Sequence, residues 1–181
     1  MTRSFIAFIV VCTGLFTGCN SPEATPESET APVANSLADS VQVAPADPAD
    51  VESIEAIIKA YYEVVSGPAG SVPDKKRDQS LHHPDHWIAI ANTNSEGQPG
   101  IRTMNLDDFY GDLDPREEGF FEWETERVVQ RHQNMASVWS HYASSKTEGG
   151  EPFTTGVNTI TLWFDGTRWW VMNWMFDTSS G

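Results

Sequence analysis

The sequence predicts an α+β domain in which N-terminal helices pack on one face of a curved antiparallel β-sheet. Three observations indicate this fold class. Apolar residues recur at helical spacing over residues 51–65, long β-rich runs follow from residue 120, and the last two runs flank Asp165-Gly166. Helices followed by a series of strands are typical of α+β domains. Asp-Gly between two such runs is a strong hairpin signal.

The first half of the domain is predicted to begin with an amphipathic helix. Asp50 is placed to cap a helix that starts at Val51. Gly67-Pro68 ends it, because neither residue continues a helix well. The apolar positions that share one side of this helix are Val51, Ile54, Ile57, Ile58, Tyr61, Val64 and Val65. This side is expected to face the core.

Shorter elements are expected between this helix and the long strands. Residues 74–81 predict a second, largely polar helix, and Asn105 is placed to cap a brief third one. Pro84 indicates a turn that leads into a short strand at Trp87–Ala91. Residues 92–100 are expected to form a polar loop.

The second half is predicted to consist of strands at 120–131, 135–144, 153–164 and 168–176. Alternation along the last strand places Trp170, Met172, Trp174 and Phe176 on one face, and Trp169, Val171, Asn173 and Met175 on the other. A sheet in a monomer needs only one apolar face. We therefore expect the outer face to form a homodimer, unless the chain's own loops cover it.

The chain begins with features of a bacterial lipoprotein. A basic start at Arg3 precedes an apolar run over residues 5–15, which is the length of a signal-peptide core and too short to span a membrane. The run ends Leu15-Phe16-Thr17-Gly18-Cys19, which resembles a lipobox except for Phe16, where leucine is preferred. We expect Cys19 to be lipidated and the protein to be anchored in the bacterial cell envelope, facing the periplasm or the exterior. The alternative is an ordinary secretory leader with a chance cysteine.

Composition divides the rest of the chain in two. Residues 20–50 are rich in Pro, Ser, Ala and acidic residues and lack aromatic ones, which predicts a disordered tether. Residues 51–181 carry ten basic and twenty acidic side chains, so this domain has a net charge of −10 and is not expected to bind nucleic acid. The two cysteines, Cys12 and Cys19, both precede the tether, so the domain has no internal disulfide.

Five short motifs follow one another in an order that is typical of one superfamily. They are Ala60-Tyr61-Tyr62, His83-Pro84-Asp85, Met135–Val138, Gly156–Leu162 and Asp165–Val171. In this order and spacing, residues 51–177 resemble the nuclear transport factor 2-like superfamily, which includes ketosteroid isomerase, scytalone dehydratase and the SnoaL-type polyketide cyclases. The resemblance implies a conical cavity between a bent sheet and three helices, often in a homodimer. Isomerases, dehydratases, cyclases and binding modules share this fold, so it does not choose a function.

Several polar and aromatic side chains are candidates to line such a cavity. Asn158 shares a strand face with apolar residues, so its amide must find hydrogen bonds, either within the protein or on a ligand. Tyr142 shares a face with Ala136 and Val138, and Arg127 lies on the face of Trp123. The cavity candidates are Tyr61, Tyr62, Trp87, Phe109, Arg127, Tyr142, Asn158 and Trp174. The alternative is that these side chains serve packing.

Acid–base residues give a weaker signal. His83, Asp85 and His86 are the candidates for a general base and the group that orients it. A metal site is not expected, because Pro84 disfavours the helical spacing that His83 and His86 would need. Glu122, Glu124 and Glu126 alternate along a strand and are interpreted as a solvated face.

From these observations we expect a binding module without a cofactor, whose cavity takes a small apolar ligand or a protein partner. One alternative is a cofactor-free lyase or isomerase with a His/Asp base. A second is a docking module for another envelope protein.

Overall fold

The computed structural model describes residues 45–180. The expected leader, Cys19 and most of the tether lie outside the described residues. The tether predicted to reach residue 50 ends earlier, because a first short helix begins at Pro48. None of the helices described is long and apolar enough to cross a membrane.

Four helices precede or interrupt the strands. They are α1 (Pro48–Val51), α2 (Ile54–Val65), α3 (Lys75–Leu81) and α4 (Leu106–Tyr110). Asn105 caps α4 as the sequence predicts, and Asp74 caps α3. The expected cap at Asp50 is wrong: Asp47 caps α1, and Ser53 starts α2 by accepting a hydrogen bond from the Ala56 amide. Asp50 is instead buried, and both of its carboxylate oxygens accept from the Arg77 guanidinium at 2.7 Å.

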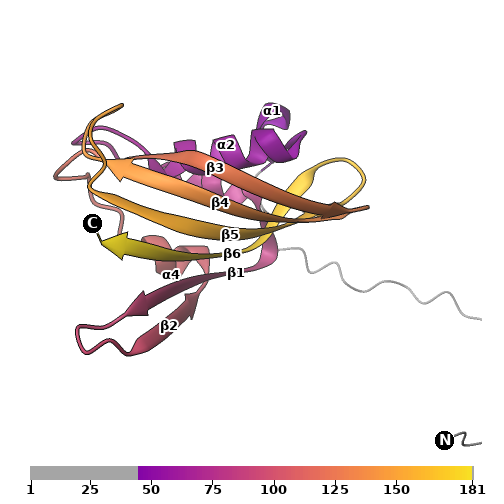
Figure 1. The fold of residues 1–181 in the computed structure, drawn as a ribbon. Coiled ribbons are helices and arrows are strands. Elements are labelled where there is room, and N and C mark those ends of the chain that lie inside the picture. The colour runs from indigo at the N-terminus through magenta and orange to yellow at the C-terminus, as the bar shows by residue number, and fades with distance from the viewer. Residues whose placement is uncertain (1–44, 181) are drawn as a thin grey trace, which may run out of the picture. The chain divides into compact units, whose positions relative to one another are not determined.

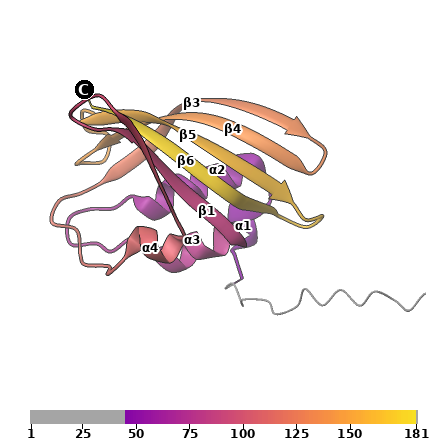
Figure 2. The ribbon, with the colours of Figure 1, turned by 90° about the horizontal axis from the view of Figure 1, so that it is seen from below.

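Six strands form one curved sheet in the order β2-β1-β6-β5-β4-β3, and the helices cover one of its faces (Figures 1 and 2). The strands are β1 (His82–Thr93), β2 (Pro99–Met104), β3 (Phe121–His132), β4 (Met135–Ser145), β5 (Thr154–Phe164) and β6 (Trp169–Ser180). The predicted α+β class is confirmed. The sheet is mixed rather than wholly antiparallel, because β1 pairs with β6 in parallel.

The region between α3 and α4 differs most from the expectation. The predicted short strand is longer, and part of the predicted polar loop belongs to β2, which pairs antiparallel with β1. Pro84 does not turn the chain but lies inside β1, where the pairing with β6 is irregular between His82 and Trp87. A proline is tolerated at such a site because its missing N–H removes no regular ladder bond.

A bulge in β6 changes which side chains of the last strand share a face, compared with the prediction. Thr161 pairs with Asn173 and Leu162 with Val171, so Met172 is the extra residue. The expected alternation is therefore wrong across this position. Trp169, Val171 and Trp174 are buried on the face toward the helices, with exposed fractions of 3, 0 and 2%. Trp170 lies opposite Trp163 on the outer face.

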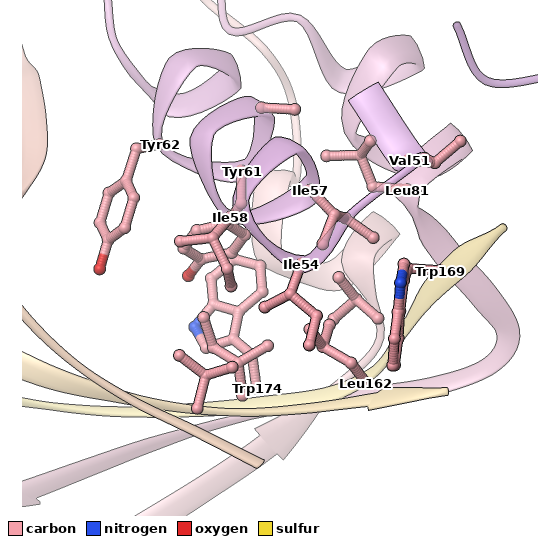
Figure 3. Close-up of a cluster of buried hydrophobic side chains, with 14 of the residues drawn as sticks. Val51, Ile54, Ile57, Ile58, Tyr61, Tyr62, Leu81, Leu162, Trp169 and Trp174 are labelled. Atoms are coloured by element: carbon pink, nitrogen blue, oxygen red, sulfur yellow. The ribbon is translucent and has the colours of Figure 1, made fainter. Parts of the chain in front are cut away.

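The core lies between α2 and the inner face of the sheet (Figure 3). Ile57 and Ile58 of α2 are completely buried, and the Tyr61 ring meets Trp174 edge-on, with ring centroids 4.6 Å apart. Aromatic rings in this arrangement contribute about 0.5–1.5 kcal/mol beyond the area they bury. In Figure 3 the Tyr62 side chain points away from the centre of this cluster. Its hydroxyl belongs to the site described next.

Candidate functional site

A cavity of about 230 Å³ lies between α2, α4 and the inner face of the sheet. It is lined by Tyr61, Val65, Phe109, Phe120, Glu122, Tyr142, Ser144, Thr154, Asn158, Trp174 and Phe176. A cavity of about 150 Å³ is enough to hold benzene. We call this space the interior cavity; it has room for a molecule of one or two rings.

Aromatic rings form much of the interior cavity's wall. The Phe109 ring, from α4, lies 5.2 Å from the Trp174 ring, and the Phe176 ring lies 6.3 Å from it. These are ordinary packing distances for aromatic pairs. Phe109 belongs to α4 and the other two rings to β6, so the wall forms only when the sheet and α4 have come together.

Among residues 45–180, Glu122 is the one residue with a carboxyl side chain that lines the interior cavity. Its Oε2 accepts a hydrogen bond from the Ser144 hydroxyl at 3.0 Å. Within residues 45–180 its Oε1 has no hydrogen-bond partner, and no lysine or arginine lines the cavity. Burial raises the pKa of Glu122 to about 7, although the hydrogen bond from Ser144 acts in the opposite direction. A carboxyl with such a pKa can both accept and donate a proton near neutral pH.

A bulge in β3 explains why Glu122 faces inward. Glu122 and Glu124 lie opposite Ser144 and Tyr142 on the inner face, whereas Glu126 lies opposite His141 on the outer face. The register shift falls between Glu124 and Glu126. The prediction that Glu122 and Glu124 lie on a solvated face of the strand is therefore wrong. The signal that could have shown this is on the neighbouring strand, where serines occupy inward positions beside both glutamates.

Four polar side chains continue from the cavity wall in a buried chain of hydrogen bonds. The Asn158 amide donates to the Tyr62 hydroxyl at 3.0 Å, and the Tyr62 and Ser140 hydroxyls are 2.6 Å apart. Ser140 donates to Glu124 Oε1 at 2.5 Å, so the Tyr62 hydroxyl must donate to Ser140. The Asn158 amide thus finds its partner within the protein. Burial raises the pKa of Tyr62 to about 12.

A second, larger space of about 560 Å³ lies between α2 and β3, and we call it the outer groove. Glu122 lines both spaces, so its carboxyl lies where they adjoin. The two cationic side chains of the outer groove are already paired. Lys59 forms an ion pair with Glu63, and Arg127 donates through Nε to Glu124 at 2.8 Å.

Gly156 on β5 makes room for one wall of the cavity. A Cβ atom added there would lie 2.5 Å from the Tyr142 hydroxyl oxygen. Glycine therefore lets the Tyr142 ring lie across β5 and present its hydroxyl beside the cavity. Burial, with the nearby charge of Glu122, raises the pKa of Tyr142.

The predicted cavity residues separate into three groups. Tyr61, Phe109, Tyr142, Asn158 and Trp174 line the interior cavity. Tyr62 and Arg127 line the outer groove. Trp87 lies elsewhere, because it is 45% exposed and pairs with Asn173 on the outer side of the sheet.

The structure does not bring the predicted base residues into either space. The His83 ring meets the edges of Trp163 and Trp170, and the Asp85 side chain is 90% exposed. His86 accepts a hydrogen bond from the Leu106 amide at 3.1 Å and so helps to start α4. The reason for the difference is that β1 continues through these residues and does not turn toward the cavity.

A separate buried polar cluster lies between α3, α4 and β1. The Asp78 carboxyl accepts from the Tyr110 hydroxyl at 2.7 Å, and His82 Nδ1 lies 2.8 Å from the Asp78 carbonyl oxygen. Burial raises the pKa of Asp78 to about 7 and lowers that of His82 to about 4. Neither residue lines the interior cavity or the outer groove. Over residues 45–180, no three His, Cys, Asp or Glu side chains are grouped to hold a metal ion.

Comparison with known proteins places the fold. No protein-family model matches the chain, and no curated protein does. A protein of unknown function with a cystatin-like fold from Nostoc punctiforme PCC 73102 has 12% identity and a TM-score of 0.51, over 70% of this chain and 88% of that one.

Two further solved structures are less similar. A candidate ketosteroid isomerase from Parabacteroides distasonis ATCC 8503 has 17% identity over 76% of this chain and 97% of that one, with a TM-score of 0.47. An NTF2-like protein of unknown function from Shewanella baltica OS155 has 9% identity over 69% of this chain and 90% of that one, with a TM-score of 0.41.

The domain shares its fold with the cystatin-like protein from Nostoc punctiforme, and its α+β arrangement is consistent with the nuclear transport factor 2-like fold that the sequence motifs resemble. Helices come first, and a curved sheet then encloses a cavity against them. At identities of this size the likeness concerns the fold alone, so a function has to be argued from the site.

Proposed function

We propose that the domain binds a small, mainly apolar molecule in the interior cavity. The observation that carries this proposal is a space of about 230 Å³ with aromatic walls and one carboxyl group that has no cationic partner among the lining residues. Pockets that hold small molecules are usually apolar with a few polar groups that fix orientation. Glu122, Tyr142 and Asn158 are the orienting groups.

Toluene is a suitable first probe, because it matches the cavity in size and carries no polar group. We expect it to bind the full-length chain with 1:1 stoichiometry, measured by ligand-observed NMR. Val65→Phe places a ring in the cavity and should abolish binding, whereas Val72→Phe, at a position 47% exposed, should not. Equal binding by both variants would exclude the interior cavity as the site.

A second candidate function is proton transfer on a bound molecule without a cofactor, as in an isomerase or lyase. Glu122 supports it, because a carboxyl group borders the cavity, whereas His83 and Asp85 do not. The test is deuterium incorporation from heavy water beside the carbonyl of a small cyclic ketone. Catalysed exchange that Glu122→Gln abolishes would favour the enzyme. If a ketone is shown to bind but no exchange is observed, the result would favour a binding module without catalytic activity.

As to location, we propose that the protein is anchored in the cell envelope by a lipid attached to Cys19, and that residues 20–47 tether the domain to this anchor. The apolar run and the lipobox-like sequence support this. Cys19→Ala should move the protein from the membrane fraction to the soluble one, whereas Cys12→Ala should leave it in place. Membrane partitioning that survives Cys19→Ala would contradict lipidation at this residue.

For assembly, we propose a homodimer through the outer face of the sheet. Apolar side chains exposed there include Met135, Trp139 and Trp163, with exposed fractions of 59, 51 and 39%. They lie on β4 and β5, in the middle of the sheet rather than at its edge. Sedimentation analysis should give a dimer, and Trp139→Glu should give a monomer. A monomeric wild type would favour instead a docking surface for another envelope protein.

A further inference from the structure

The charges around the interior cavity are not balanced. Glu122 lines it without a cationic partner among residues 45–180, and its Oε1 accepts no hydrogen bond there. Burying a carboxylate without a counter-charge is unfavourable. A ligand that supplies the missing positive charge would therefore gain an interaction that the protein itself does not make.

The nearest cations of the adjoining groove are not free to supply it. Lys59 is held by Glu63, and Arg127 is held by Glu124, which also accepts from Ser140. Releasing Arg127 would leave Glu124 without its cationic partner, whereas Glu63 is shared by Lys59 and Arg77. Because both cations of the groove are paired, Glu122 is, within residues 45–180, the cavity's carboxyl group without a cationic partner.

The walls of the cavity are suited to the same kind of ligand. Phe109, Trp174 and Phe176 present aromatic surface in the same cavity as the Glu122 carboxyl group, with Trp174 and Phe176 on β6 and Glu122 on β3. This surface can receive the apolar part of a ligand whose charged end lies at Glu122. Aromatic walls and one carboxylate together favour a positively charged nitrogen attached to an apolar body.

We propose that the molecule bound in the interior cavity is an organic amine, held as an ammonium ion against Glu122 with its apolar part among the aromatic rings. This inference rests on the proposed ligand-binding function and narrows it to a chemical class. An organic anion does not suit this cavity, because its charge would be repelled by Glu122 and no lysine or arginine lines the cavity among residues 45–180.

Three probes of similar size test the inference on the full-length chain: benzylamine, toluene and benzoate. They carry a positive charge, no charge and a negative charge at pH 8. By calorimetric titration and ligand-observed NMR, we expect benzylamine to bind at least tenfold more tightly than toluene. Benzoate should not bind measurably.

Glu122→Gln provides the decisive variant, because it removes the charge and keeps the size of the side chain. It should lower the affinity for benzylamine at least tenfold, to the level of toluene. A far-UV circular dichroism spectrum like that of the wild type shows that the variant is folded. Glu117→Gln makes the same charge change at an exposed position outside both spaces and should alter neither affinity.

The outcomes separate the two proposals. The proposal that the ligand is an amine is wrong if toluene binds and benzylamine binds no better, or if Glu122→Gln leaves the affinity for benzylamine unchanged. The proposal that the interior cavity binds a ligand is then retained. If no probe binds, the proposed binding function fails, and the amine fails with it. Equal losses in Glu122→Gln and Glu117→Gln would indicate attraction to the acidic surface as a whole, which also overturns the inference.

Discussion

Glu122 and Asp78 are two carboxyl groups whose pKa values are raised alike in different surroundings, Glu122 being half-buried and Asp78 fully buried. Burial raises the pKa of each to about 7. Glu122 borders two open spaces, whereas Asp78 is completely buried and borders neither. A raised pKa therefore identifies a carboxyl group that has lost water, but access to a cavity decides whether a ligand can reach it.

The hydrogen-bond partners of the two residues also differ: those of Asp78 come from other helices and strands around it, whereas Glu122 has one partner for its side chain. The Asp78 carboxyl accepts from the Tyr110 hydroxyl, and the Asp78 carbonyl oxygen lies 2.8 Å from His82 Nδ1, so this residue connects α3 to α4 and β1. Its Oδ1 has no hydrogen-bond partner within the described residues. Glu122 receives only the Ser144 hydroxyl on its side chain. We interpret the Asp78 cluster as a structural connection and Glu122 as the group available for binding.

The largest effect is expected at Trp174, which touches both regions. Its ring lines the interior cavity and lies 5.7 Å from the His82 ring. Trp174→Ala should lower the free energy of unfolding by about 3–5 kcal/mol, because it removes a fully buried ring. Urea unfolding measures this change. Trp163→Ala, at a ring 39% exposed, should cost much less; similar losses would show that Trp174 is not central to the core.

Asp78→Ala should have the next largest effect. It leaves the Tyr110 hydroxyl without its buried partner, which typically costs about 1–3 kcal/mol. Glu122→Ala should cost less, since water can enter the adjoining space. Urea unfolding of both variants at pH 5, where both carboxyls are protonated, compares them directly. A larger loss at Glu122 would reverse the structural roles assigned to the two groups.

The pH dependence of stability tests Glu122 itself. An acid whose folded-state pKa is raised from 4.5 to about 7 binds its proton more tightly in the folded chain. Its contribution to stability is therefore present below pH 4.5 and is lost as the pH rises through 7. Glu122→Gln removes this loss. As the pH rises from 5 to 8, the free energy of unfolding of the variant should therefore increase relative to that of the wild type by on the order of 1–2 kcal/mol. A constant difference across this range would contradict the raised pKa.

Ser144→Ala should give the smallest effect. It removes the hydrogen bond that Glu122 accepts, so the pKa of Glu122 should rise further while stability falls by about 1 kcal/mol. Carbon-detected NMR titration of the glutamate carboxyls measures the pKa. Thr155→Ala, at an exposed position on the neighbouring strand, is the control and should leave the titration of Glu122 unchanged.

Much of the fold could be predicted because it follows from periodicity and local signals. The helix over 54–65, the cap at Asn105 and the hairpin at Asp165-Gly166 are each encoded within a few residues. The strand β2 was missed because its side chains are mostly exposed and show no apolar alternation. Its position depends on pairing with β1, which a local pattern does not reveal.

The site was harder to predict because it depends on two single-residue irregularities. One extra residue at Thr125 turns Glu122 and Glu124 inward and Glu126 outward, and one at Met172 exchanges the faces of β6. Strict alternation assigns every residue beyond such a bulge to the wrong face. Cavity candidates such as Tyr142 and Asn158, on the regular strands β4 and β5, are not affected.

The hydrogen-bond chain from Asn158 through Tyr62 and Ser140 to Glu124 connects β5, α2, β4 and β3. Its direction is fixed, because the Asn158 amide nitrogen at one end can only donate and the Glu124 carboxylate at the other can only accept. The helix is thus held in one register against three strands before any ligand arrives. Such preorganisation lowers the conformational entropy lost on binding. A ligand of modest size can therefore be retained without closure of a lid.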